Sequence, residues 1–151
     1  MSMMNKGMYT SDRGDWRTPI DLFNKLEDEF GFDIDVCASK ENNLCPSYFD
    51  KDNDFLKQDI LIPNAKCFMN PPYGRKIGEF VKHAYDQSVK HNTTFVCLLP
   101  SRTDTKWWHD YCLKGEIRFI RGRLRFDDNA DPGARAPFPS CIVIFKSPNA
   151  D

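Results

Sequence analysis

The sequence lacks long apolar runs: no stretch approaches the roughly 18 consecutive apolar residues that a membrane-spanning helix needs. Residues 1–15 also lack the apolar stretch of a secretory signal peptide. A disordered chain is excluded, because 40% of the 151 residues are hydrophobic and 12 of them are Phe. We therefore expect a soluble cytoplasmic protein without a membrane partner. It would have a flexible N-terminal arm, residues 1–15, and a single folded domain, residues 16–151.

Closely spaced metal ligands are missing as well. The six cysteines occur singly, without any C-x-x-C pair, and the three histidines show no metal-ligand spacing. Most of the cysteines lie within apolar stretches, as in the segments 97–100 and 140–145. We interpret them as reduced core residues, and we expect neither disulfides nor a metal ion.

An excess of positive charge is also missing, since the formal net charge is −1. The charge is nevertheless unevenly distributed along the chain. Residues 1–60 hold seven basic and thirteen acidic side chains, whereas residues 61–151 hold fourteen basic and nine acidic ones. The net charge of the whole chain therefore does not exclude a nucleic-acid contact through the second part.

Helical and strand patterns alternate along the chain. The helical spacings predict helices at about 19–30, 76–90 and 103–113. The apolar runs predict strands at 32–38, 66–69, 94–99, 117–120 and 140–145. Thr18 is expected to cap the first helix, with Pro19 at its first position and Gly31 after its end. Residues 39–64 read as loops with at most one short helix. This alternation predicts an α/β fold with crossover connections.

The tetrapeptide Asn70-Pro71-Pro72-Tyr73 follows a predicted strand and precedes a predicted helix. The side-chain oxygen of Asn70 and the main-chain oxygen of Pro71 can accept hydrogen bonds from an amine conjugated to an aromatic ring. Such bonds draw the lone pair of the amine out of conjugation. The prolines restrict the backbone that carries these oxygens, and Tyr73 offers a ring for stacking on a flipped base.

The same tetrapeptide has an ordinary structural explanation, because Asn-Pro and Pro-Pro are common turn formers. Its position favours a functional interpretation. Open α/β sheets bind their ligands beyond the carboxyl ends of the strands, which is where this motif is expected to lie.

Beyond this motif, most of the chain resembles the phage-type DNA N6-adenine methyltransferases, the Dam-like phage family. The matching segments extend from Trp16 to Phe145 and keep their order. They are W-R-T-P at 16–19, D-V-C-A-S at 35–39, F-L-K-Q-D at 55–59, F-M-N-P-P-Y-G at 68–74, L-L-P-S-R-T-D-T-K-W-W-H at 98–109, F-I-R-G-R-L-R-F at 119–126 and P-F-P-S at 137–140. Several ordered matches are far harder to obtain by chance than one tetrapeptide.

The resemblance implies a truncated Rossmann-like sheet flanked by helices. It also implies transfer of a methyl group from S-adenosylmethionine to the N6 of adenine in double-stranded DNA. Such a protein would be encoded by a phage or prophage and act in a bacterial host. By this resemblance the catalytic residues are Asn70, Pro71, Pro72 and Tyr73, and the cofactor-binding residues are Trp16, Thr18, Pro19, Asp35, Cys37, Ala38, Asp54 and Asp59.

The cofactor assignments have alternatives. The glycine-rich cofactor loop of the wider superfamily is missing, and the segment 37–39 occupies its place. Asp35 could be a solvated carboxylate at the end of a strand, and for Asp59 the functional and structural interpretations are equally plausible. Glu41, Asp52 and Asp54 are all candidates for binding the cofactor ribose.

Basic residues are concentrated near residue 120. If this segment is extended, Arg121, Arg123 and Arg125 share one face, which suits contacts with DNA phosphates. Arg102 and Lys76 add positive charge at the ends of other predicted elements. The alternative is a solvated charged face without a partner.

Two other functions are compatible with these patterns. A motif that binds a planar amine or amide could serve an N-methyltransferase acting on RNA adenine or on a protein amide. A catalytically silent homologue could bind DNA through its basic part alone.

Overall fold

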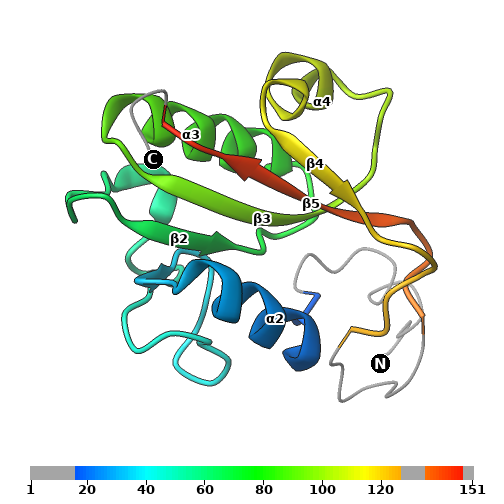
Figure 1. Cartoon of the computed structure of the whole chain (residues 1–151), viewed down its shortest axis with the longest axis horizontal. Helices are drawn as coiled ribbons and strands as arrows, with labels where there is room; N and C mark the ends of the chain where they lie inside the picture. Colours follow the sequence, from blue (N-terminus) through cyan, green and yellow to red (C-terminus); the bar gives the residue numbers. More distant parts are fainter. Residues whose placement is uncertain (1–15, 127–134, 148–151) are drawn as a thin grey trace.

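The computed structural model describes residues 16–126 and 135–147. The predicted arm, residues 1–15, lies outside these residues, as do residues 127–134 and 148–151. The helices are α2 (Ile20–Phe30), α3 (Ile77–Lys90) and α4 (Lys106–Asp110), with short 3-10 helices η1 (Phe55–Lys57) and η2 (Cys112–Lys114). The strands are β1 (Ile34–Asp35), β2 (Lys66–Met69), β3 (Thr94–Pro100), β4 (Glu116–Phe119) and β5 (Ser140–Phe145) (Figure 1).

The five strands form one mixed sheet in the order β1-β2-β3-β5-β4. The first three strands are parallel, and α3 makes the crossover between β2 and β3. Strand β5 runs antiparallel to both of its neighbours. The predicted α/β class is therefore confirmed, while the antiparallel return of β5 is a feature of the tertiary structure.

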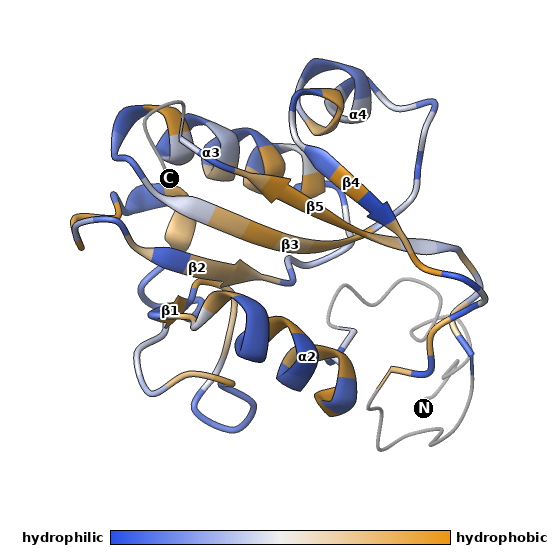
Figure 2. Cartoon of the chain, viewed as in Figure 1, coloured by the Kyte–Doolittle hydropathy of each residue, from blue (hydrophilic) through white to orange (hydrophobic). Residues whose placement is uncertain are grey.

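Helices cover both faces of the sheet. The register places Phe68, Val96 and Ile144 side by side on one face, where α2 packs Phe23 against Phe68. Phe95 and Phe145 lie on the opposite face, which is covered by η1 and α3. Figure 2 shows the central strands as almost continuously hydrophobic and α2 as banded, as expected for a sheet buried on both faces and a helix buried on one.

The helix that precedes β3 matches its prediction closely. The helix predicted at about 76–90 is α3, and five positions that recur at helical spacing are buried in it: Ile77, Phe80, Val81, Ala84 and Ser88. In contrast, the predicted helix at 103–113 is divided into α4 and η2. Thr105 caps α4, because its side chain accepts a hydrogen bond from the Trp108 amide.

Two local predictions are wrong. The predicted strand 32–38 shortens to β1, because the Asp35 carboxylate accepts a hydrogen bond from the Cys37 amide at 3.3 Å, which turns the chain. Thr18 does not cap α2: the N-cap is Pro19, without a side-chain cap, and the Thr18 hydroxyl contacts Asn70 instead. The expected end of this helix is confirmed by Gly31, which adopts a left-handed φ of 66°.

Candidate active site

A cavity of about 1150 Å³ lies at the carboxyl ends of β1 and β2. Its walls come from segments 16–18, 35–44 and 50–56, together with residues at the end of β2 and the start of α3. Ligand cavities usually measure roughly 300–1,000 Å³, so this one has room for an elongated ligand of nucleoside size or larger. Its position beyond parallel strands is where α/β folds bind ligands.

The cavity brings together predicted site residues that are distant in the sequence. Nine of them line it: Trp16, Thr18, Asp35, Cys37, Ala38, Asp54, Asn70, Pro72 and Lys76. Glu41 and Asp52, the other candidates for the ribose, line it too. Phe80 of α3 also lines the cavity, although its helical spacing in the sequence does not distinguish a cavity wall from a core position.

The structure does not bring Asp59 to this cavity. Asp59 borders a separate depression beside Ile60, and its carboxylate accepts a hydrogen bond from Gln87 Nε2 at 2.8 Å. Asp54 does line the cavity, with one oxygen accepting the Leu56 amide at the start of η1. Of these two acids, Asp54 is therefore the one positioned to meet a ligand here. Pro19 does not line the cavity and serves as the N-cap of α2.

Asp35 is a buried carboxyl group at the cavity wall. Its side chain accepts hydrogen bonds from the amides of Leu44 at 3.2 Å and Cys37 at 3.3 Å, and only 3% of the residue is exposed. Burial raises the pKa of Asp35 to about 6, and the two amide bonds offset only part of this effect. The interpretation of Asp35 as a solvated carboxylate is thus wrong.

The nitrogen of the Asn70 carboxamide is hydrogen-bonded, whereas its oxygen is not. Its Nδ2 donates to the main-chain oxygen of Trp16 and to Thr18 Oγ1, the latter at 3.0 Å. Its Oδ1 is buried and accepts no hydrogen bond from any residue that the structure describes. A buried acceptor without a partner has a cost, and a ligand that donates a hydrogen bond would remove it.

Tyr73 differs from its prediction. Only 6% of the residue is exposed, its hydroxyl donates to the Leu98 carbonyl at 2.9 Å, and its ring packs against Phe126 and Phe138. Burial raises the pKa of this phenol well above its usual value, so the group remains a neutral donor. The expectation of an open stacking surface is therefore wrong for this structure, because core packing takes up the ring. Pro71 is buried and does not line the cavity, while Pro72 is exposed and does line it.

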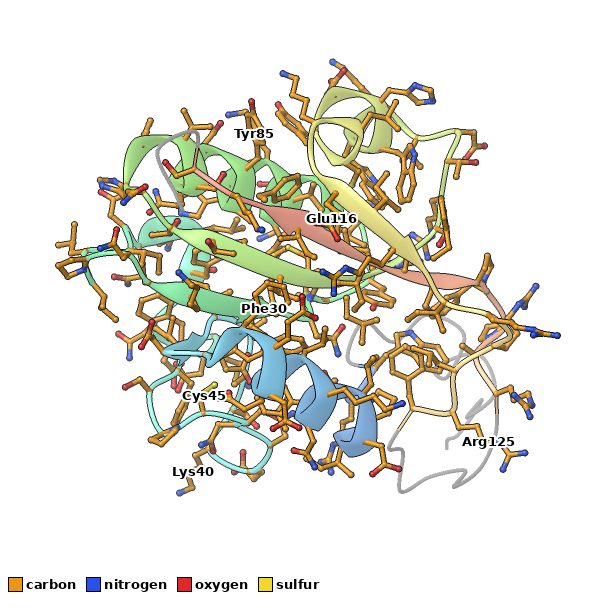
Figure 3. All side chains as sticks on the ribbon, in the orientation of Figure 1. Phe30, Lys40, Cys45, Tyr85, Glu116 and Arg125 are labelled. Carbon is orange, nitrogen blue, oxygen red and sulfur yellow. The ribbon has the colours of Figure 1, made fainter. Side chains whose placement is uncertain are left out.

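The predicted arginine face is exposed. Arg121, Arg123 and Arg125 all reach solvent, whereas the intervening Leu124 is half-buried and the following Phe126 is buried. In Figure 3, Arg125 lies at the lower right of the molecule, apart from Lys40 of the cavity loop at the lower left. Arg102 is half-buried just after β3, and Lys76 lies at the cavity rather than in the arginine strip.

Two further arginines change the charge of this surface. Arg118 forms a two-pronged ion pair with Glu29 at 2.7 Å and a second ion pair with Glu116, so its charge is neutralised within the protein. Arg135 pairs with Arg125 through an isolated antiparallel main-chain bridge, and its Nη1 donates a hydrogen bond to the Arg123 carbonyl at 2.9 Å. Like charges opposite each other repel, and neither arginine has an ion-pair partner among the described residues. An anion would relieve this repulsion.

All six cysteines are free thiols, as predicted, and only Cys37 lies at the cavity. Burial raises the pKa of Cys37 well above its usual value, so its thiol remains protonated. Within residues 16–126 and 135–147, no group of three potential ligands is arranged to hold a metal ion. No helix in the same ranges is long and apolar enough to cross a membrane.

The chain is similar to known proteins in sequence. A family model described as DNA N-6-adenine-methyltransferase (Dam) matches residues 6–150. A DNA N-6-adenine-methyltransferase of Haemophilus phage HP1 is 36% identical over 143 residues, which cover 90% of this chain and 80% of that protein. A DNA N-6-adenine-methyltransferase of Escherichia phage T1 is 33% identical over 135 residues, which cover 87% of this chain and 56% of that protein. A solved structure titled "Structure of a putative methyltransferase from Thermoplasma acidophilum" is 10% identical, with a TM-score of 0.45, over 99% of this chain and 78% of that chain.

Proposed function

The chain belongs to the DNA N-6-adenine-methyltransferase (Dam) family, and from this premise we propose that it transfers a methyl group from S-adenosylmethionine to the N6 of adenine in double-stranded DNA. The observation that carries the proposal is the buried Asn70 Oδ1, an acceptor without a partner among the described residues, at the end of a parallel strand. Both relatives are phage proteins, which supports a phage- or prophage-encoded enzyme in the cytoplasm of a bacterial host.

The cavity residues fit a cofactor that combines a cationic amino acid part with a ribose. Asp35 supplies a buried carboxylate for the cationic part, while Asp54, Glu41 and Asp52 offer oxygens to the ribose hydroxyls. Cys37 and Ala38, in the turn that follows Asp35, line the same cavity. S-adenosylmethionine, when bound, supplies an electrophilic methyl group on its sulfonium.

Asn70 is the group that we assign to the adenine. Its Oδ1 and the main-chain oxygen of Pro71 accept hydrogen bonds from the exocyclic amine, which makes the nitrogen lone pair more available for attack on the methyl group. Such acceptors act in a largely desolvated site and need no rearrangement during the reaction. Tyr73 contributes by anchoring the motif to β3 through its bond to Leu98.

The substrate class can be tested by methyl incorporation. Labelled S-adenosylmethionine would be incubated with the protein and with DNA, RNA or protein of matched concentration. We expect incorporation into DNA, recovered as N6-methyladenine after digestion. Incorporation only into RNA or protein would contradict the proposal. DNA binding without any incorporation or cofactor binding would instead indicate a catalytically silent DNA-binding protein.

The exposed arginines are proposed to contact the DNA backbone. Replacing Arg125 by Ala should weaken DNA binding and lower the slope of log affinity against log salt by about one, because roughly one counterion is released per phosphate contact. Fluorescence anisotropy at several salt concentrations measures both quantities. Lys82→Ala is the matched control: it removes one positive charge from α3, where Lys82 pairs with Asp86, and should leave the slope unchanged. Equal slopes for Arg125→Ala and the wild type would contradict this contact.

A further inference from the structure

The Asn70 carboxamide is held by a segment more than fifty residues earlier in the chain. Its Nδ2 donates one hydrogen bond to the Trp16 carbonyl and one to Thr18 Oγ1. Thr18 is 8% exposed, so solvent competes little for its hydroxyl. The nitrogen end of the amide thus has both of its hydrogens bound.

This arrangement determines which end of the amide faces the ligand. A carbonyl oxygen can only accept hydrogen bonds, so the atom beside Trp16 O must be the nitrogen. Rotating the amide by half a turn would place Oδ1 against another oxygen and would leave the Trp16 carbonyl without its donor. The bound orientation therefore leaves Oδ1 as the atom available to a substrate amine.

The segment that carries these acceptors is itself fixed. The Trp16 ring packs against Phe126 and Phe138, with both pairs of ring centroids 5.3 Å apart. On the other side of Thr18, Pro19 restricts the backbone directly before α2. Packing on one side and a restricted backbone on the other hold the Thr18 hydroxyl in place.

We propose that Thr18 is a positioning residue, which acts through Asn70 rather than by binding the cofactor. Its hydroxyl fixes the carboxamide so that Oδ1, and not Nδ2, meets the amino group of the substrate. This inference rests on the proposed function for the identity of that amino group. It differs from the sequence-based assignment of Thr18 to the cofactor, because the partner that the structure gives to this hydroxyl is Asn70 Nδ2, which donates to it at 3.0 Å.

The test compares Thr18→Val with Thr18→Ser. Valine keeps the shape and removes the acceptor, whereas serine keeps the acceptor. Thr93→Val is the matched control, since Thr93 is also buried and its hydroxyl has no partner among the described residues. Each protein would be assayed for kcat, for cofactor affinity by calorimetry, and for hydrogen exchange of the Asn70 side-chain amide by NMR.

We expect Thr18→Val to lower kcat by about tenfold or more, the scale of one lost hydrogen bond that orients a reacting group. Cofactor affinity should change less than about twofold, while one Asn70 amide proton should exchange about tenfold faster. Thr18→Ser should restore both quantities, and Thr93→Val should change neither.

Other outcomes separate this inference from the proposed function. A cofactor affinity that falls in Thr18→Val as much as the activity does would overturn the positioning role and favour direct binding. An unchanged kcat would overturn it as well. If the wild-type protein does not methylate adenine, the proposed function fails, and the NMR comparison alone then decides the inference: unchanged exchange in Thr18→Val contradicts it, and faster exchange supports it.

Discussion

Asn70→Ala is expected to lower the rate of adenine methylation by about a hundredfold to a thousandfold, the range observed when one preorganised hydrogen-bonding group is removed from a reacting centre. The variant loses the Oδ1 acceptor at the cavity. It also releases Trp16 and Thr18 from their bonds to Nδ2. Because Asn70 is not assigned to the cofactor, cofactor affinity should remain within a few-fold of the wild type.

Single-turnover methylation of DNA, combined with calorimetric titration of S-adenosylmethionine, measures both quantities. Asn24→Ala is the matched control, because Asn24 lies on the exposed face of α2 and should tolerate the same truncation. A variant that methylates at the wild-type rate with the cofactor bound would disprove the assigned role of Asn70. A thermal melt of each protein separates loss of chemistry from loss of folding.

Cofactor affinity is expected to fall as the pH is lowered through about 6, the pKa of Asp35. A cationic group next to Asp35 favours the ionised carboxyl, so protonation removes an attraction from the complex. Well below this pKa, affinity should fall by up to about tenfold for each pH unit, and above it affinity should level off.

The stability of the protein without cofactor should follow the opposite trend. The pKa of Asp35 is raised from 3.8 to about 6, so the folded state binds the proton more tightly than the unfolded state does. The protonated Asp35 carboxyl therefore stabilises the folded state. This stabilisation is fully present below pH 3.8 and is lost as the pH rises through about 6. The change corresponds to about 3 kcal/mol in the free energy of unfolding. Denaturant unfolding at several pH values measures it.

Asp35→Asn is the variant that tests this assignment. Its side chain does not titrate, so the step in cofactor affinity near pH 6 should disappear. Asp21→Asn, at an exposed position in the first turn of α2, is the control and should keep the wild-type profile. A step of unchanged size in Asp35→Asn would assign the titration to another group.

Local patterns in the sequence were sufficient for much of the fold. The spacing of α3, the apolar runs of β3 and β5, and the position of Asn70 after β2 all depend on residues close together in the chain. Burial of one helix face, or of both faces of a strand, imposes a period that can be read directly. The exposure of Arg121, Arg123 and Arg125 follows from the same alternation.

Contacts between distant segments were not predictable in this way. Thr18 has the features of a helix cap, and only the approach of β2 to the start of α2 engages its hydroxyl with Asn70. The local sequence does not indicate whether the Tyr73 ring is open or packed, because Phe126 and Phe138, which cover it, come from a later part of the chain. Arg118 belongs to a basic run, yet Glu29 of α2 neutralises it.

By itself, therefore, the sequence determined the α/β class, the family resemblance and the residues at the ends of the parallel strands. The tertiary structure decided the partner of each polar group: Gln87 holds Asp59 away from the cavity, while Asp54 remains at its wall. It also decided which atom of Asn70 is left without a partner among the described residues. The physical reason is that period and propensity act locally, whereas hydrogen-bond satisfaction and burial depend on all segments that meet at one place.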